Sequence, residues 1–240
     1  MTFLDKFSGF SLVDVAAVVA FLCLWVSTNY IIENAPKHRQ SMTQIMATFR
    51  RDWMRVMVTR DPRIVDTAVL GFLRQGSTFF ASTTLLVIGG GLAMLGNTEQ
   101  LSGVAEDFAL QNTSPFVWEV KILMVIAIIS NAFLKFVWAH RLFGYCAVLM
   151  ASVPNKEDDP NAYPMAAKTA EICTTASRSF NRGLRSLYFA LAGLAWLIDP
   201  IALLAAATLS FLVLYRREFK SRSRDILLAD MAKKPIEGLT

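Results

Sequence analysis

The sequence has little charge and few of the residues that carry out catalysis. Only 18% of its 240 residues are charged, against about 25% in a soluble domain. It has two histidines, too few for a persuasive metal or haem cluster. It contains no Gly-x-Ser-x-Gly elbow, no phosphate-binding P-loop and no His-Glu-x-x-His motif. These absences exclude an ordinary cytosolic enzyme, and we expect no enzymatic activity, no cofactor and no bound metal.

Cysteine is also scarce. Cys23, Cys146 and Cys173 are odd in number and show no CxxC spacing, which argues against a disulfide framework or a zinc site. We interpret them as small buried or interfacial residues. His38, within a Lys-His-Arg cluster, is interpreted as part of the membrane-flanking charge, and His140 as an interfacial polar residue.

Long apolar segments dominate instead. Hydrophobic residues make up 54% of the chain, and the mean hydropathy is +0.42. A spanning helix needs about 20 mostly apolar residues. Segments 12–32, 77–95 and 116–139 meet this need, and a fourth region, 187–215, is longer than one span requires. The composition therefore predicts an all-α, polytopic transmembrane bundle that forms one domain over residues 1–240.

The charges of the connecting segments predict the topology. Segments 33–76, 140–185 and 216–240 hold eight, six and seven Lys or Arg residues, whereas segment 97–115 holds none and has three acids. Lys and Arg are in excess on the cytoplasmic side of membrane proteins. We therefore expect 97–115 to face outside and the three cationic segments to face the cytoplasm.

This topology predicts a hairpin in the fourth region. Two cytoplasmic segments flank it, so the chain must cross the membrane twice there, over about 180–198 and 201–215. Asp199 suits the N-cap and Pro200 the first turn of the returning helix. The result is five spans in a bacterial inner membrane, with the N-terminus outside and the C-terminus inside. The alternative is one kinked span of 29 residues, which would place the seven cations of the tail outside.

Segment 39–59 has apolar residues at helical spacing, with Arg50, Arg51 and Arg55 between them. This pattern predicts an amphipathic cytoplasmic helix. Two placements stay open. The helix lies on the inner leaflet with Trp53 at the level of the lipid headgroups, or it packs against other cytoplasmic helices.

Several spans are expected to continue past the membrane as long helices. Asp61 and Pro62 are predicted to be the N-cap and first residue of the helix that leads into the second span. The third span can continue to about Ser152, and residues 165–198 are helical in composition. We therefore expect a substantial cytoplasmic extension of the bundle.

Lys135 is the strongest candidate for a functional residue. An ionisable side chain within a membrane span has a high free-energy cost and commonly marks a functional site. On a helix Lys135 shares a face with Asn131 and Trp138, and this polar stripe suits a solute pathway. The alternative is that Lys135, near the inner boundary, extends its ammonium to the interface. Glu119 and Lys121, near the outer end of the same span, are interpreted as an interfacial pair.

Two arginine groups lie at the predicted cytoplasmic boundary. Arg178, Arg182 and Arg185 form one stripe at helical spacing, and Arg216 and Arg217 end the last span. They suit either contact with anionic lipids of the inner leaflet or a vestibule that attracts anions.

The chain resembles the domain of unknown function 599 family, multi-span proteins of bacteria and plants. The resemblance rests on residues 179–185 (SFNRGLR), 188–192 (YFALA), 215–219 (YRREF) and 49–54 (FRRDWM), together with Trp196 and Pro200. It covers nearly the whole chain and implies the multi-span fold. The family name implies no activity, cofactor or catalytic residue.

We therefore expect a homo-oligomeric channel or transporter for a small, anionic solute. The alternative is an accessory or scaffold subunit of a larger inner-membrane complex. A third hypothesis, a lipid-modifying enzyme that uses His140 and Arg141 at headgroup level, lacks the necessary acid, base and nucleophile. The expected partners are anionic lipid, further copies of the chain or another membrane subunit. Nucleic acid is not expected, because the topology accounts for the net charge of +5.

Overall fold

The computed structural model describes residues 9–96 and 115–233, and all regular secondary structure in these ranges is helical. The helices are α1 (Leu12–Glu33), α2 (Met42–Met57), α3 (Ile64–Leu95), α5 (Pro115–Ser152), α6 (Ala162–Gly193), α7 (Pro200–Phe219) and α8 (Arg222–Lys233), with short 3-10 helices at Lys37–Arg39 and Leu194–Leu197. The predicted all-α class is confirmed. Apart from Pro115, the predicted outer segment 97–115 lies outside the described residues, as do the last residues of the tail.

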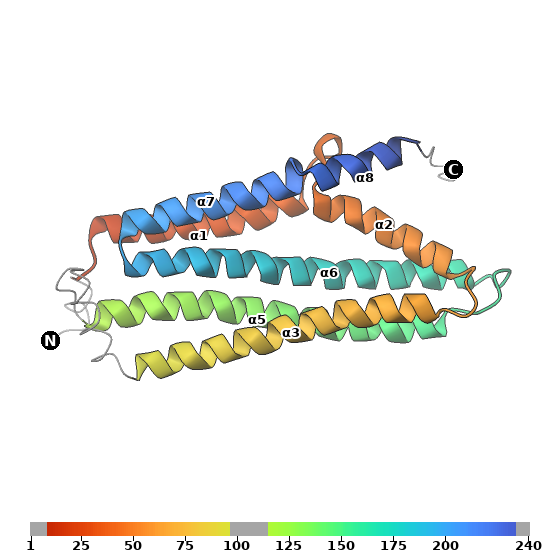
Figure 1. Cartoon of the computed structure of the whole chain (residues 1–240), viewed down its shortest axis with the longest axis horizontal. Coiled ribbons are helices and arrows are strands. Elements are labelled where there is room, and N and C mark those ends of the chain that lie inside the picture. Colours follow the sequence, from red (N-terminus) through yellow and green to blue (C-terminus); the bar gives the residue numbers. More distant parts are fainter. Residues whose placement is uncertain (1–8, 97–114, 234–240) are drawn as a thin grey trace.

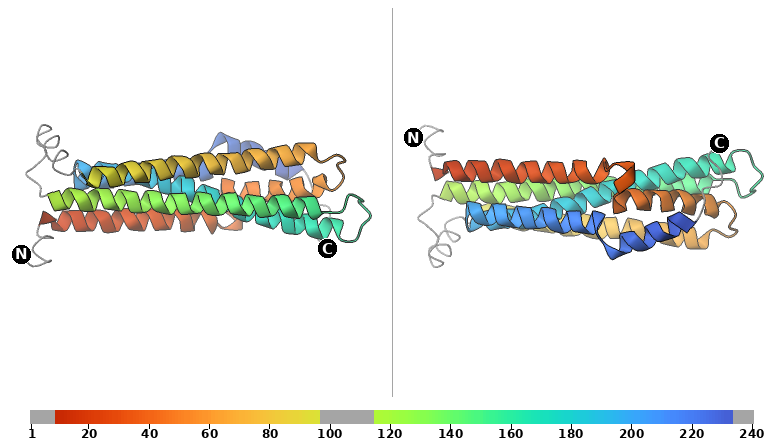
Figure 2. Two further views of the ribbon diagram at one scale, coloured as in Figure 1. Left: turned by 90° about the horizontal axis from the view of Figure 1, so that it is seen from below. Right: turned by 90° about the horizontal axis from the view of Figure 1, so that it is seen from above.

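The bundle has two halves along its length (Figure 1). In the first, called here the apolar half, α1 and α7 lie side by side against α6, while α3 packs against α5 on the other side of the bundle. In the second, called here the polar half, α2 and α8 take their place, as the two further views also show (Figure 2). The helices α3, α5 and α6 run through both halves. With 32, 38 and 32 residues they are about 48, 57 and 48 Å long at 1.5 Å per residue. All three exceed the hydrocarbon thickness of a bilayer, about 30 Å.

The apolar half has the surface of a membrane protein. Four helical stretches are long and apolar enough to cross a membrane: α1, α3, α5 and the stretch that begins at Pro200. Large apolar side chains such as Phe79 and Leu86 on α3 are 63% and 77% exposed. In water such a continuous apolar surface would drive aggregation, whereas in lipid it is matched to its surroundings. The helix α6 is less apolar than these four stretches, because three arginines lie along its middle.

The chain reverses at Asp199 and Pro200. The Asp199 carboxylate accepts a hydrogen bond from the backbone N–H of Ile201 at 2.6 Å and caps α7. Beyond the turn, the hydroxyl of Ser210 donates to the carbonyl of Tyr188 at 3.4 Å, so α7 runs back along α6. The region is thus two antiparallel helices, and the single kinked helix of the alternative interpretation is not formed.

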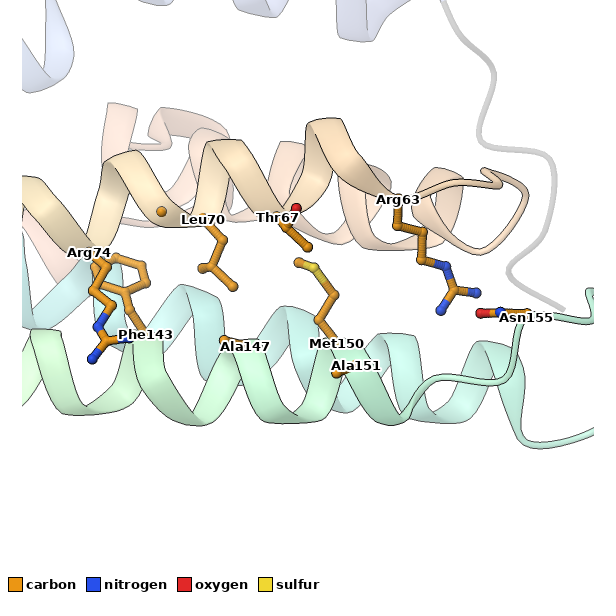
Figure 3. Close-up of a pocket in the computed structure, with 10 residues that line it drawn as sticks. Arg63, Thr67, Leu70, Arg74, Phe143, Ala147, Met150, Ala151 and Asn155 are labelled. Atoms are coloured by element: carbon orange, nitrogen blue, oxygen red, sulfur yellow. The ribbon is translucent and has the colours of Figure 1, made fainter.

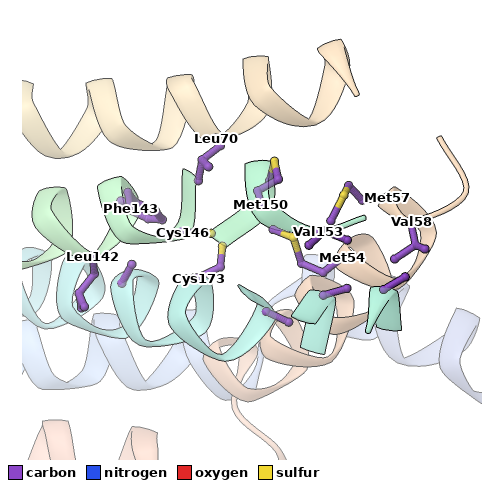
Figure 4. Packing of buried hydrophobic residues seen from close by; sticks show 14 of the residues in the cluster. Met54, Met57, Val58, Leu70, Leu142, Phe143, Cys146, Met150, Val153 and Cys173 are labelled. Atoms are coloured by element: carbon purple, nitrogen blue, oxygen red, sulfur yellow. The ribbon is translucent and has the colours of Figure 1, made fainter. Parts of the chain in front are cut away.

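Each half has its own core. In the apolar half Phe21 and Phe189 meet edge to face, with ring centroids 5.8 Å apart. In the polar half Met54, Met150 and other apolar side chains of α2, α5 and α6 pack together (Figure 4). The free thiols of Cys146 and Cys173 lie in this second core, both fully buried, whereas Cys23 is exposed.

The helix α2 packs against the bundle. Its N-terminus is fixed by a capping box between Ser41 and Gln44, and the Gln44 amide also donates to the carbonyl of Ala35 at 2.9 Å. Its apolar face is buried against α6. The Trp53 indole N–H donates to Asp66 on α3 at 2.7 Å. Of the two placements open from the sequence, the structure therefore has the second, with the helix against its neighbours.

The predicted start of α3 is wrong by two residues. Asp61 and Pro62 precede the helix and are joined by a cis peptide bond, and Arg63 takes the N-cap position. The Arg63 guanidinium donates to the carbonyls of Val153 and Pro154, both at 2.7 Å. This contact ties the start of α3 to the end of α5, a long-range constraint that the local pattern does not contain.

Candidate functional site

A polar cavity lies where α1 ends, at the junction between the two halves. Its volume is about 300 Å³. The lining side chains come from the last turns of α1 and from facing turns of α5 and α6: Asn29, Tyr30, Glu33, Asn34, Asn131, Lys135, Arg182 and Ser186. We call this cavity the Glu33 site. Since α1 begins at the far end of the apolar half, its 22 residues place Glu33 about 33 Å from that end, close to the thickness of the hydrocarbon core.

Glu33 is held by two arginines of α6. Its Oε1 accepts from Nε of Arg182 at 2.7 Å and from Nη2 of Arg185 at 2.6 Å. Oε2 accepts from the second edge nitrogen of Arg182. Both pairs are charge-assisted, the stronger class of hydrogen bond. The exposed fractions of the three side chains differ: 13% for Glu33, 46% for Arg182 and 3% for Arg185.

Arg185 is the most constrained of these groups. Its Nε donates to Oδ1 of Asn29 at 2.7 Å, while Nη2 donates to Glu33. One edge of the guanidinium is therefore saturated by α1, and Nη1 is buried without a hydrogen-bond partner. The prediction that Arg185 faces the leaflet in one stripe with Arg178 and Arg182 is therefore wrong, because α1 covers it.

The structure brings Asn131 and Lys135 into the Glu33 site. Asn131 accepts a hydrogen bond from the hydroxyl of Ser186 at 3.3 Å. Lys135 is half-buried and takes part in no ion pair among the described residues. Within the described residues, the Lys135 ammonium therefore has no carboxylate paired with it.

Trp138 does not join the site. It is 48% exposed and does not line the cavity. The hydroxyl of Ser179 donates to the carbonyl of Lys135 at 2.9 Å, which fixes the register of α5 against α6. Trp138 lies about one turn further along α5 than Lys135.

The electrostatic balance of the Glu33 site favours an anion. The cavity is lined by two cations, Lys135 and Arg182, and by one carboxylate, that of Glu33. Arg185, which also pairs with Glu33, does not line the cavity. Asn29, Asn131 and Ser186 add neutral polar groups. Charges near low-dielectric walls act more strongly than charges in water. The arrangement can hold a small anion against Lys135 and Arg182 while Glu33 keeps the arginines in place.

The other arginines that the sequence predicts to contact lipid or an anion lie on α6 and α7. Arg178, Arg182 and Arg216 are exposed. Arg217 donates to the hydroxyl of Tyr188 and lies over its ring at 5.8 Å. Contact of these side chains with lipid stays a prediction.

Two arginines of α2, Arg51 and Arg55, border a groove of about 990 Å³ between α2 and α6, whereas Arg50 does not line it. Arg51 pairs with Glu171 at 2.7 Å, Arg55 is exposed, and burial lowers the pKa of Arg50. At one end of the groove the hydroxyl of Tyr163 donates to Glu157 at 2.7 Å, which raises the pKa of Tyr163.

A third cavity, of about 330 Å³, lies between α3 and α5 in the polar half (Figure 3). Arg74 at its edge contacts His140, with Nε 3.4 Å from Nε2 of the imidazole. His140 Nδ1 is 3.0 Å from the hydroxyl of Thr78. His140 thus joins α3 to α5. Among the described residues, no three His, Cys, Asp or Glu side chains are grouped as metal ligands.

Lys121 is not the surface partner of Glu119 that the sequence suggested. It is 8% exposed, and its ammonium lies over the rings of Trp118 and Trp196, at 5.8 and 5.6 Å. Residues two apart on a helix do not face each other. The Trp196 indole, in the 3-10 helix after α6, donates to Asp14 on α1 at 2.8 Å. Trp196 therefore connects Lys121 of α5 with the first turn of α1.

The sequence interpretation missed Glu33, which it counted only as one of the charges in segment 33–76. The sequence signal that points to Glu33 is an acidic residue at the end of a predicted span, in a chain that has several arginines near the ends of other spans. Its partners lie 149 and 152 positions away, so the pairing itself is a property of the fold.

Comparison with known proteins identifies the family and adds no activity. No curated protein matches the chain, and no solved structure matches it. The model of one family, described as protein of unknown function DUF599, matches residues 16–223. This range contains every residue of the Glu33 site. The chain therefore belongs to the DUF599 family of proteins of unknown function.

Proposed function

We propose that this protein is a non-enzymatic integral membrane protein that binds a small anionic solute at the Glu33 site and acts as a homo-oligomeric channel or transporter. The observation that carries the proposal is the positive charge surplus of the cavity lining, two cations (Lys135 and Arg182) against one carboxylate (Glu33) that is already paired with Arg182 and Arg185. Ionisable residues at membrane depth are costly and commonly mark solute pathways.

The path of the chain supports five spans. The helices α1, α3, α5, α6 and α7 each run through the apolar half, so α1 starts and α8 ends at opposite ends of the bundle (Figure 1). The cation-rich segments surround the polar half. By the positive-inside rule the proposed orientation has the N-terminus outside and the C-terminus in the cytoplasm, in the inner membrane of a bacterium.

The packing of the apolar half bears on how a solute would cross. Between the Glu33 site and the outer end, the core around Phe21 and Phe189 fills the interior of a single copy. A path between copies would leave this core intact. The proposal therefore includes a homo-oligomer, with Arg178 and Arg216 at the level of anionic headgroups in the inner leaflet.

Anion flux tests the proposal. The protein is reconstituted in vesicles, and uptake of isotope-labelled sulfate and inorganic phosphate is measured. Lys135→Met should abolish the uptake of at least one of these anions and leave assembly intact. Lys156→Met is the matched control, since Lys156 is an exposed residue outside the site. Equal uptake by the two variants would remove Lys135 from the proposed pathway.

A second candidate function is that of an accessory subunit in a larger membrane complex. The groove between α2 and α6, about 990 Å³ with an apolar floor and a charged rim, favours it. The mass and composition of the complex extracted in a mild detergent separate the two functions. Copies of this chain alone support the channel or transporter, whereas a companion protein at fixed stoichiometry supports the accessory subunit.

A further inference from the structure

The cavity between α3 and α5 is separate from the Glu33 site and has a different character. Its floor is apolar, with Leu70, Phe143 and Met150, while Arg63 and Arg74 stand at its two ends (Figure 3). No acidic side chain is among the described residues that line it. The cavity therefore combines a hydrophobic surface with uncompensated positive charge.

The two arginines are engaged differently. Both Nη atoms of Arg63 donate at 2.7 Å to backbone carbonyls at the end of α5, a structural role. Among the described residues, the Arg74 guanidinium makes only long contacts, 3.4 and 3.5 Å, with the imidazole of His140. Neither arginine is in an ion pair within the described part of the chain. Arg74 is therefore the guanidinium that is free to receive an anion.

The position of Arg74 suits a ligand that arrives from the membrane. Arg74 lies three residues before the predicted second span, which starts at residue 77, or about 4.5 Å along the helix. From there the apolar floor runs away from the membrane towards Arg63 (Figure 3). Gly71 forms part of the wall, and a Cβ atom there would meet no atom within 4 Å.

We infer that this cavity binds an amphiphile with a single alkyl chain that ends in an oxyanion, either a carboxylate or a phosphate. The oxyanion pairs with Arg74 at the membrane boundary, and the chain lies on Leu70, Phe143 and Met150. A guanidinium pairs with either oxyanion through two parallel hydrogen bonds. Burial of the alkyl chain on the apolar floor supplies the hydrophobic contribution to binding. This inference is independent of the solute proposed for the Glu33 site.

Photo-crosslinking tests the inference on the full chain in nanodiscs of phosphatidylcholine. Three probes of equal chain length carry a diazirine: a fatty acid, a monoalkyl phosphate and a fatty alcohol. The fatty acid or the alkyl phosphate should label the α5 peptide that contains Ala147 and Met150, and the stronger of the two identifies the head group. The alcohol should label it about tenfold less, because loss of a charge-assisted hydrogen bond has at least that effect on affinity.

Matched variants separate occupancy of the cavity from general partition into the bilayer. Gly71→Leu fills the cavity and should abolish the labelling. Gly76→Leu is the control, because Gly76 also has free space at Cβ but does not line the cavity. Arg74→Gln should lower labelling by the anionic probe to the level of the alcohol. Equal labelling in the two leucine variants, or equal labelling by acid, phosphate and alcohol in the unmodified protein, overturns the inference.

Discussion

The carboxylate of Glu33, the last residue of α1, lies 2.6 Å from Nη2 of Arg185, in the middle of α6. Arg185 is 3% exposed, so a full positive charge is held inside the bundle where the membrane-type helices meet the polar half. A buried charge is tolerated only if it is paired and hydrogen-bonded. The pair therefore fixes α1 against α6 at this level and shapes the cavity beside it.

Glu33→Gln should destabilise the protein strongly. The change leaves Arg185 without its counter-charge, a loss that costs about 3 kcal/mol or more for a buried pair. For a chain of this length, that corresponds to a fall of about 6–12 °C in Tm. Thermal unfolding in detergent, followed by circular dichroism, measures it. The control is Glu171→Gln, since the pair of Glu171 with Arg51 is exposed on both sides and should contribute less than about 1 kcal/mol. Similar Tm values for both variants would contradict this role of Glu33.

Gly183→Ala should destabilise the contact between α5 and α6. A Cβ atom at Gly183 would lie 2.7 Å from the ring of Phe136, which is fully buried and cannot move aside freely. Overpacking of this kind costs about 1–3 kcal/mol. Gly89→Ala, where a Cβ atom meets nothing within 4 Å, should leave the Tm unchanged or slightly higher. The comparison of the two melting curves decides whether the helices approach as closely as described.

Trp53→Phe should lower the Tm of the protein. The variant keeps an aromatic ring in the core but loses the hydrogen bond from the indole to Asp66, a carboxylate with no exposed surface. Oδ1 of Asp66 keeps its ion pair with Arg60, so the change removes one hydrogen bond to a charged group, which contributes about 1.5–3 kcal/mol. Trp138→Phe, at a position that is 48% exposed, serves as the control. A Tm of Trp53→Phe equal to that of Trp138→Phe would contradict the packing of α2 against α3.

A reporter protein fused after Thr240 should lie in the cytoplasm, so only a reporter that works in the cytoplasm should give a signal. The proposed five passes through the membrane, with the N-terminus outside, would place the tail inside, in agreement with its seven Lys and Arg residues. Paired fusions, one to an enzyme active only outside the cytoplasm and one to a fluorescent protein that folds only inside it, give opposite signals. Activity of the external reporter would overturn the proposed orientation.

Periodicity and caps predicted most of the helices because these signals are local. Segment 39–59 contains α2, and the Asp199-Pro200 turn was recognised from its cap and its proline. The start of α3 was misplaced because it depends on Arg63 reaching the end of α5, a contact across 90 positions. Local patterns contain no information of that kind.

The candidate site was predictable only in part. Helical spacing placed Asn131 and Lys135 on one face, and both line the cavity. The same spacing included Trp138, which does not line the cavity. The burial of Arg185 depends on which helix covers it, and Glu33 and Arg185 are 152 positions apart. The spacing of residues along one helix does not predict which residue of another helix pairs with them.

The binding of inorganic sulfate to the purified protein, measured by isothermal titration calorimetry at low salt, tests the Glu33 site most directly. We expect the unmodified protein and the Lys156→Met control to bind sulfate alike. Lys135→Met should bind it about tenfold or more weakly, since one charge-assisted contact is lost. Binding that is the same in all three proteins, or absent from all three for both sulfate and inorganic phosphate, would contradict the assignment of the Glu33 site as an anion site.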